Sequence, residues 1–252
     1  MISICLTHRT PTLLAIVGIG LVAALVTAFI VMNGNQSEAN RGDDVKSFVS
    51  DLQSTAEDSQ IVARVDGQPV SKGAIRIQTV LGLRYGTADL SSPLEIKQLS
   101  RYEAEVLAAR RAMQSAAMMA EVERRNIEVS LEEAQARNEG DRAMIERMKN
   151  MDPEDLTIDA WEGLQVLEAR IELSGLTEDE WWEDRVEYCR QLLYITKLKT
   201  QVLSDLPAEA GQFERMQAWE DFQENLLAEA DIEILDEAME PLIQEVLTRI
   251  KN

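Results

Sequence analysis

The sequence contains almost no histidine or cysteine. The only histidine, His8, and the first of the two cysteines, Cys5, lie before a long apolar run near the start of the chain. The rest of the chain therefore offers only Cys189, which excludes an internal disulfide there, Ser–His and Cys–His nucleophilic arrangements, and zinc sites that use histidine. No phosphate-binding glycine loop or zinc-protease helix motif is present. We predict no catalytic residue, no metal and no cofactor, and we expect Cys189 to be a small core residue.

Positive charge is also scarce. The chain has 45 acidic residues against 25 lysines and arginines, and every acidic residue lies beyond Met32. Such a field repels phosphate backbones, so nucleic-acid binding is excluded as a function. We expect most of these charges to be solvated helix faces, with a specific basic partner as the alternative interpretation.

One apolar run, from Leu13 to Met32, contains no charged residue. At about 1.5 Å per residue, a helix of this length spans a hydrocarbon core of roughly 30 Å. A cleaved signal peptide is the alternative, but its apolar region is about 7–15 residues long, and the small-x-small site Ser37-Glu38-Ala39 is weak. We predict a cytoplasmic tail over residues 1–12, a single transmembrane helix over 13–32, and an extracytoplasmic domain anchored to the cell membrane.

The segment after this run is polar and is expected to be a linker over residues 33–60, with a short helix around Val45–Leu52 as an open alternative. Residues 61–70 then predict a β-hairpin, because apolar residues alternate and Asp66-Gly67 suits a tight turn. A lone hairpin is marginally stable. We therefore expect Ile232–Leu235, which also alternates, to add a third strand.

The remaining sequence predicts helices, so the fold class is mainly α with a small three-stranded sheet. Three helix starts are predicted from capping boxes, in which a hydroxyl and a carboxylate three residues later satisfy free backbone amides: Ser92 with Glu95, Ser130 with Glu133, and Thr177 with Glu180. We expect the helix after Ser92 to be the longest, and we expect another long helix after Thr177. Further helices are predicted over about residues 208–230 and 236–250.

Four stretches occur in an order that is known from one protein family. They are IVARVDGQPVSKGAI from Ile61, MMAEVERRNIEVSLEEAQAR from Met118, GLTEDEWWEDRVEYCRQLLYITKL from Gly175, and LLAEADIEIL from Leu226. In this order they resemble the chaperone domain of the SurA/PrsA/PpiD family of extracytoplasmic folding factors. The usual Asn of the hairpin turn is Asp66 here.

The resemblance implies a chaperone scaffold over residues 61–252 without a prolyl isomerase. An inserted parvulin domain needs at least about 50 residues, and the interval between Leu203 and Arg215 is far too short. The implied function is that of a membrane-anchored holdase whose partners are unfolded or newly exported polypeptides. The alternative is an envelope scaffold that holds one folded partner, and isomerase activity is a weaker third possibility.

The candidate client-binding residues are flexible methionines and tryptophans. Thioether side chains adapt to varied apolar sequences, and adjacent tryptophans on a helix point about 100° apart. Each of these side chains can instead be ordinary core between helices. The candidates are Met113, Met118, Met119, Met144, Met148, Trp161, Trp181 and Trp182.

Overall fold

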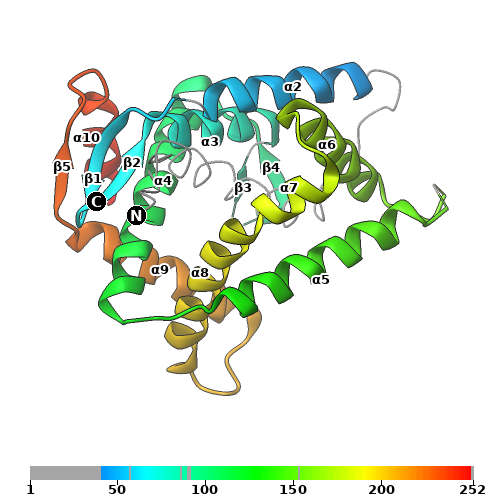
Figure 1. Cartoon of the computed structure of the whole chain (residues 1–252). Helices are drawn as coiled ribbons and strands as arrows, with labels where there is room; N and C mark the ends of the chain where they lie inside the picture. Colours follow the sequence, from blue (N-terminus) through cyan, green and yellow to red (C-terminus); the bar gives the residue numbers. More distant parts are fainter. Residues whose placement is uncertain (1–40, 57, 86, 90–91, 153, 251–252) are drawn as a thin grey trace, which may run out of the picture.

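The computed structural model describes residues 41–56, 58–85, 87–89, 92–152 and 154–250, and it is mainly helical with two small sheets (Figure 1). The helices are α2 (Arg41–Ala56), α3 (Lys72–Tyr85), α4 (Arg101–Arg124), α5 (Leu131–Lys149), α6 (Ile158–Ser174), α7 (Glu178–Asp184), α8 (Val186–Ser204), α9 (Gln212–Glu229) and α10 (Glu240–Ile250). The strands are β1 (Ile61–Val65), β2 (Gln68–Ser71), β3 (Thr87–Asp89), β4 (Ser92–Lys97) and β5 (Ile232–Ile234).

The predicted third strand is confirmed. β1 pairs with β2 on one side and with β5 on the other, and both pairings are antiparallel. Asp66 and Gly67 form the hairpin turn with φ angles of 49° and 81°. The turn is also fixed to β5, because the Asp66 amide donates to the Asp231 carbonyl and the Asp66 carboxylate accepts from the Asp231 amide, both at 2.8 Å. The first and last β segments of the described chain therefore meet.

The main core lies under this sheet. Val62, Val65 and Val70 of the sheet are almost completely buried, together with Ile243 and Val246 of α10. Figure 1 shows α10 beside β1 and β5, although the two β segments are separated by most of the sequence. The C-terminal helix is thus part of the core that the N-terminal hairpin begins.

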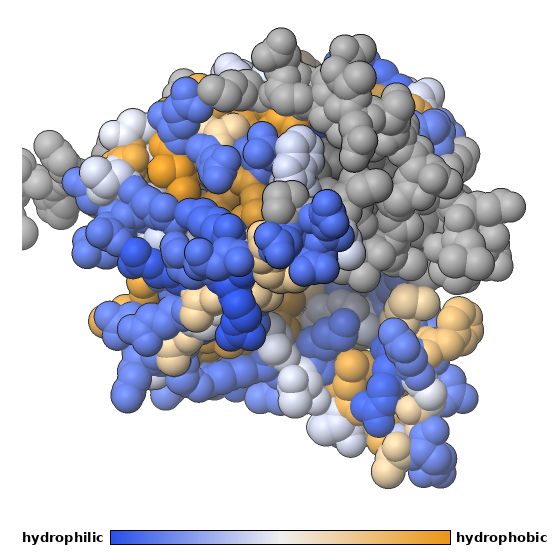
Figure 2. All heavy atoms as spheres, turned by 90° about the vertical axis from the view of Figure 1, so that its right-hand side faces the viewer, coloured by the Kyte–Doolittle hydropathy of each residue, from blue (hydrophilic) through white to orange (hydrophobic). Residues whose placement is uncertain are grey.

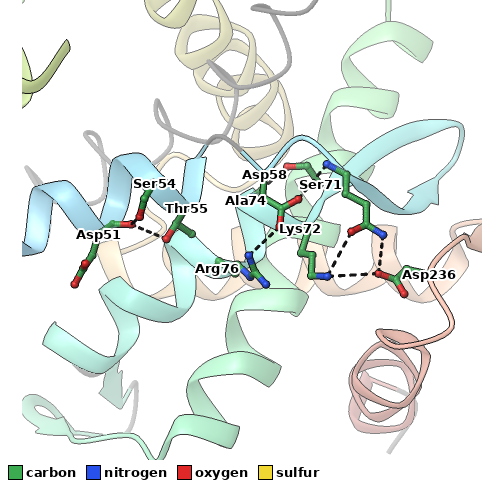
Figure 3. Close-up of polar contacts among 10 residues, drawn as sticks. Asp51, Ser54, Thr55, Asp58, Ser71, Lys72, Ala74, Arg76 and Asp236 are labelled. Carbon is green, nitrogen blue, oxygen red and sulfur yellow. Dashed lines mark hydrogen bonds and ion pairs between the residues drawn. The ribbon is translucent and has the colours of Figure 1, made fainter. Parts of the chain in front are cut away.

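A polar junction ties the same ends together on the surface. Lys72 Nζ lies 3.8 Å from the Asp236 carboxylate, and the Gln60 amide donates to that carboxylate at 3.0 Å. Next to this pair, Arg76 donates to Asp58 at 2.8 Å. Figure 3 shows these side chains gathered where α2, α3 and the segment after β5 come together. The junction joins residues on both sides of the β1–β2 hairpin to Asp236, which lies far from them in the sequence.

The expected polar linker over residues 33–60 needs correction in its second half. Residues 41–56 form the helix α2, which is longer than the short helix left open over Val45–Leu52. The reason is a helical apolar spacing, since Val45, Phe48, Val49 and Leu52 are buried in a second core against α3 and α6. Residues 33–40 lie outside the described part.

The helix start predicted at Ser92 is wrong. Ser92 begins strand β4, which pairs with β3, and the alternation of Leu94 and Ile96 is the strand signal. The helix begins eight residues later, where Ser100 and Glu103 form the capping box, with the Ser100 amide donating to Glu103 at 2.9 Å. The same Ser-x-x-Glu pattern occurs at both places, and only the second precedes a continuous helical apolar pattern.

The other two capping boxes, at Ser130 and Thr177, are confirmed. The helix after Thr177 is not continuous, because α7 ends at Asp184 and α8 begins at Val186. α9 begins at Gln212, several residues later than expected, and α10 begins at Glu240.

No helix among the described residues is long and apolar enough to cross a membrane. The predicted transmembrane helix over 13–32 and the predicted tail over 1–12 lie outside these residues.

Candidate binding surface

Three of the predicted client-binding residues are core residues, and their assignment is corrected. Met113, Met118 and Trp182 have exposed fractions of 0%, 8% and 3%. The two methionines are buried because α4 is central and contacts α3, α8, α9, α10 and the sheet, so it is covered on several sides. Trp182 is covered in the short helix α7, whose neighbours are α6 and α8.

The other predicted residues reach the surface to different degrees. Met119, Met148 and Trp181 are half-buried, whereas Met144 and Trp161 are exposed, at 42% and 38%. These two exposed side chains belong to neighbouring helices, α5 and α6. Of the side chains predicted from the sequence, only Met144 of α5 and Trp161 of α6 are therefore exposed and available to a partner.

Exposed apolar side chains concentrate in one region, Leu131–Asp184, which we name the arm and which comprises α5, α6 and α7. Of ten large hydrophobic side chains that are exposed in the described residues, six lie in the arm: Leu131, Met144, Met151, Trp161, Leu173 and Leu176. Leu131, Leu173 and Leu176 were missed because they follow or flank helix caps rather than an apolar stripe. The sequence pattern that indicates such residues is an apolar side chain close to a helix cap, here the N-cap Ser130 and the left-handed C-cap Gly175.

The end of the arm, where α5 connects to α6, carries a short row of these side chains. Met144 and Met148 are four residues apart, which places them on one side of α5, and Met151 follows just after the helix ends. Trp161 follows in the first turn of α6. Figure 1 shows this connection at the right-hand edge of the molecule. We name residues 144–161 the tip.

Figure 2 views the molecule from the side on which the tip lies. Apolar atoms are visible there between hydrophilic ones. The visible apolar atoms are not gathered in one continuous sheet of surface. They alternate with hydrophilic groups, which limits the size of any continuous apolar patch on this face.

Ion pairs connect the helices of the arm. Lys149 of α5 lies 2.7 Å from Glu178 of α7, and Arg142 of α5 donates to Asp179 of α7. The hydrogen bond and charge of Lys149 also lower the pKa of the Glu178 carboxyl against the opposing effect of its burial. These two ion pairs link α5 to α7, while the helix α5 itself packs mainly against α8 and α6.

A buried polar cluster joins the arm to α8. The amide of Asn138 donates to the Trp182 carbonyl at 2.7 Å, and Arg185 donates to Asn138 at 3.3 Å and to Asp141 at 2.9 Å. The Arg185 guanidinium also lies 5.1 Å from the Trp182 ring centre. Because the cluster satisfies its polar groups within the protein, it positions α5 against α7 and α8.

Cys189 belongs to this cluster and is completely buried, as predicted. Its thiol lies 3.5 Å from Asn138 Oδ1. Burial raises the pKa of the thiol, which keeps it in the protonated, unreactive form at neutral pH. Nearby, burial lowers the pKa of the Arg170 guanidinium of α6 to about 10, and the like charge of Arg185 adds to the effect while Tyr188 opposes it.

Comparisons of the chain with protein-family models, with curated proteins and with solved structures found no match. The resemblance to the SurA/PrsA/PpiD family therefore stays a prediction, and the properties of the surface are taken from its own side chains.

The charge of the arm is strongly negative. It contains 17 acidic residues and five basic ones, a formal charge of −12, against −20 for the whole chain. Three of the five basic residues, Arg137, Arg142 and Lys149, are held in ion pairs with carboxylates of the arm. Nine exposed carboxylates of the arm have no ion pair within the described residues: Glu132, Glu139, Asp152, Glu154, Asp155, Glu168, Glu180, Glu183 and Asp184. The surface thus combines exposed apolar side chains with uncompensated negative charge.

Among the described residues, no group of three or more His, Cys, Asp or Glu side chains is arranged to hold a metal ion.

Proposed function

We propose that this protein is a membrane-anchored holdase that binds unfolded or newly exported polypeptides with its arm on the extracytoplasmic side of the cell membrane. The observation that carries the proposal is the concentration of exposed large hydrophobic side chains in the arm, outside a core that is closed by the β1–β5 pairing. The predicted anchor at residues 13–32 and the resemblance in sequence also support it. No catalytic step is part of the proposal.

The physical mechanism is the reversible burial of apolar side chains of the client. Each Å² of apolar surface removed from water contributes about 25 cal/mol, so a few side chains such as Met144, Met151 and Trp161 give weak contacts. Weak contacts suit a holdase, because the client must leave again. The negative charge limits self-association of the exposed apolar surface.

Replacing the apolar side chains of the tip is expected to weaken this activity. The triple variant Met144→Ser, Met151→Ser, Trp161→Ser removes exposed apolar area without touching the core, and we expect half-suppression of aggregation to require about ten times more protein. The measurement is light scattering of several unrelated unfolded proteins, with the full chain held in lipid nanodiscs and empty nanodiscs as the blank.

The matched control is Tyr102→Ser, Phe213→Ser, Met216→Ser, which removes three exposed apolar side chains outside the arm. We expect it to suppress aggregation as the parent does. If the parent fails to slow the aggregation of any client at equimolar concentration, the holdase proposal is wrong. If both triple variants lose activity equally, the arm is not the binding surface.

A scaffold that holds one folded partner is the second candidate. It is favoured by the ion pairs that connect α5 to α7, because a surface of fixed shape suits a single partner. Affinity capture distinguishes the two functions. A scaffold returns one partner in a constant ratio, whereas a holdase returns many partners in small amounts.

A further inference from the structure

The tip combines two features that point to one kind of ligand. Met144, Met148, Met151 and Trp161 supply apolar and aromatic contacts at the junction of α5 and α6. The connection between the two helices adds three exposed carboxylates, Asp152, Glu154 and Asp155, none of which forms an ion pair within the described residues.

The basic residues near the tip do little to neutralise these carboxylates. Lys149 is held by Glu178 at 2.7 Å and, more weakly, by Glu146 at 3.9 Å. Arg147 is exposed and forms no ion pair within the described part of the chain. Among the tip residues whose side chains the structure describes, one unpaired cation, Arg147, therefore stands against three unpaired carboxylates, and the arm as a whole carries a formal charge of −12.

We propose that the tip selects polypeptide segments in which apolar and basic residues alternate, and that it discriminates against acidic segments of equal apolar content. This inference rests on the proposed client-binding function. A basic apolar segment places its apolar side chains on the methionines and Trp161 while its lysines or arginines reach the carboxylates of Asp152, Glu154 and Asp155. A cation can also lie over the indole ring of Trp161.

The selectivity arises from charge and depends on salt. Opposite charges at the surface attract each other over about 10 Å at 0.1 M salt, and the attraction is screened as the salt concentration rises. The same carboxylates repel an acidic segment. The difference in binding free energy between a basic and an acidic segment is therefore larger than the attraction of the basic segment alone.

Three labelled peptides test the inference by fluorescence anisotropy with the full chain in nanodiscs. The first contains Leu, Phe and Lys, the second has every Lys replaced by Glu, and the third keeps Lys but has Ser in place of Leu and Phe. We expect the first peptide to bind about tenfold more tightly than the second at 0.1 M salt, and the ratio to fall toward one at 1 M salt. The third peptide is expected to bind more weakly than the first, because it buries no apolar surface.

Neutralising the tip is expected to remove the preference. In the variant Asp152→Asn, Glu154→Gln, Asp155→Asn, the ratio between the first and second peptides should fall about threefold or more. The control Asp205→Asn, Glu209→Gln, Glu229→Gln changes the net charge equally at exposed positions outside the arm. It should leave the ratio near that of the parent.

The outcomes separate this inference from the proposed function. Equal binding of the first and second peptides overturns the charge selectivity and leaves the holdase proposal standing. Binding of the third peptide as tight as that of the first also overturns the inference, since apolar contacts then contribute nothing. Equal loss of the preference in both neutralised variants assigns it to net charge rather than to the tip. If no peptide binds and no unfolded protein is held, the proposed function itself fails.

Discussion

A chain that ends at Ala230 is expected to lose its cooperative unfolding transition. The truncation removes β5, which pairs with β1, and α10, whose Ile243 and Val246 have exposed fractions of 0% and 1%. Two fully buried aliphatic side chains contribute about 1.5–3 kcal/mol each through burial alone, and the β1 backbone loses one of its two partners. Because a typical domain is stable by only about 5–15 kcal/mol, this loss is a large fraction of the total.

Thermal unfolding followed by circular dichroism measures the effect. The control is a chain that ends at Ile250, which keeps every described residue and should unfold at the temperature of the parent. The graded variant Ile243→Ala should lower the free energy of unfolding by about 2–5 kcal/mol. A truncated chain that unfolds as sharply and at the same temperature as the parent would show that β5 and α10 are not part of the core.

The methionines are expected to separate into structural and functional classes. Met113→Ala should lower the free energy of unfolding by about 2–5 kcal/mol, because it leaves a cavity at a site with an exposed fraction of 0%. Met144→Ala should change stability by less than about 0.5 kcal/mol, since 42% of that side chain is exposed. Urea unfolding of the two variants measures the difference.

The same two variants are expected to have the opposite order of effects on client binding, with the larger loss in Met144→Ala. Met144→Ala should weaken the suppression of aggregation, whereas Met113→Ala, tested at a temperature where it stays folded, should leave it unchanged. Similar stability losses in both variants would contradict the burial that places Met113 in the core and Met144 on the arm.

The closure of the sheet could be predicted from the sequence because it depends on local signals. Asp66-Gly67 specifies a tight turn and the alternation of Ile232 and Ile234 specifies a short strand. A hairpin needs a further strand to be stable, so these signals together predicted the pairing that is found. The capping boxes at Ser130 and Thr177 were equally local, since each requires only a hydroxyl and a carboxylate three residues later.

The wrong predictions of secondary structure arise where a local sequence pattern fits two structures or where tertiary packing determines the length of a helix. Ser92 and Ser100 carry the same capping pattern, and the strand alternation of Leu94 and Ile96 distinguishes them only when it is considered as well. The helix α2 was underestimated because its apolar face is short and is stabilised by contacts with α3 and α6.

The candidate site was predicted only in part for a similar reason. Periodicity marks the apolar side of a helix, but it does not say whether another helix covers that side. Met113 lies on a helix that is covered on several sides, whereas Met144 lies on a helix whose neighbours cover it less completely. The acidic composition of the chain is evident from the sequence alone. Its concentration in the arm became a functional feature only when the exposed apolar side chains were located there.

Hydrogen exchange of the full chain with and without an unfolded client tests most directly the claim that the arm is the client-binding surface. The client should slow exchange of backbone amides at the end of α5, in the following connection and in the first turn of α6, within residues 144–161. The amides of β1 and β5 should exchange at the same rate in both samples. Slower exchange confined to regions outside the arm, such as α9, or no change anywhere while the client is bound, would contradict the account.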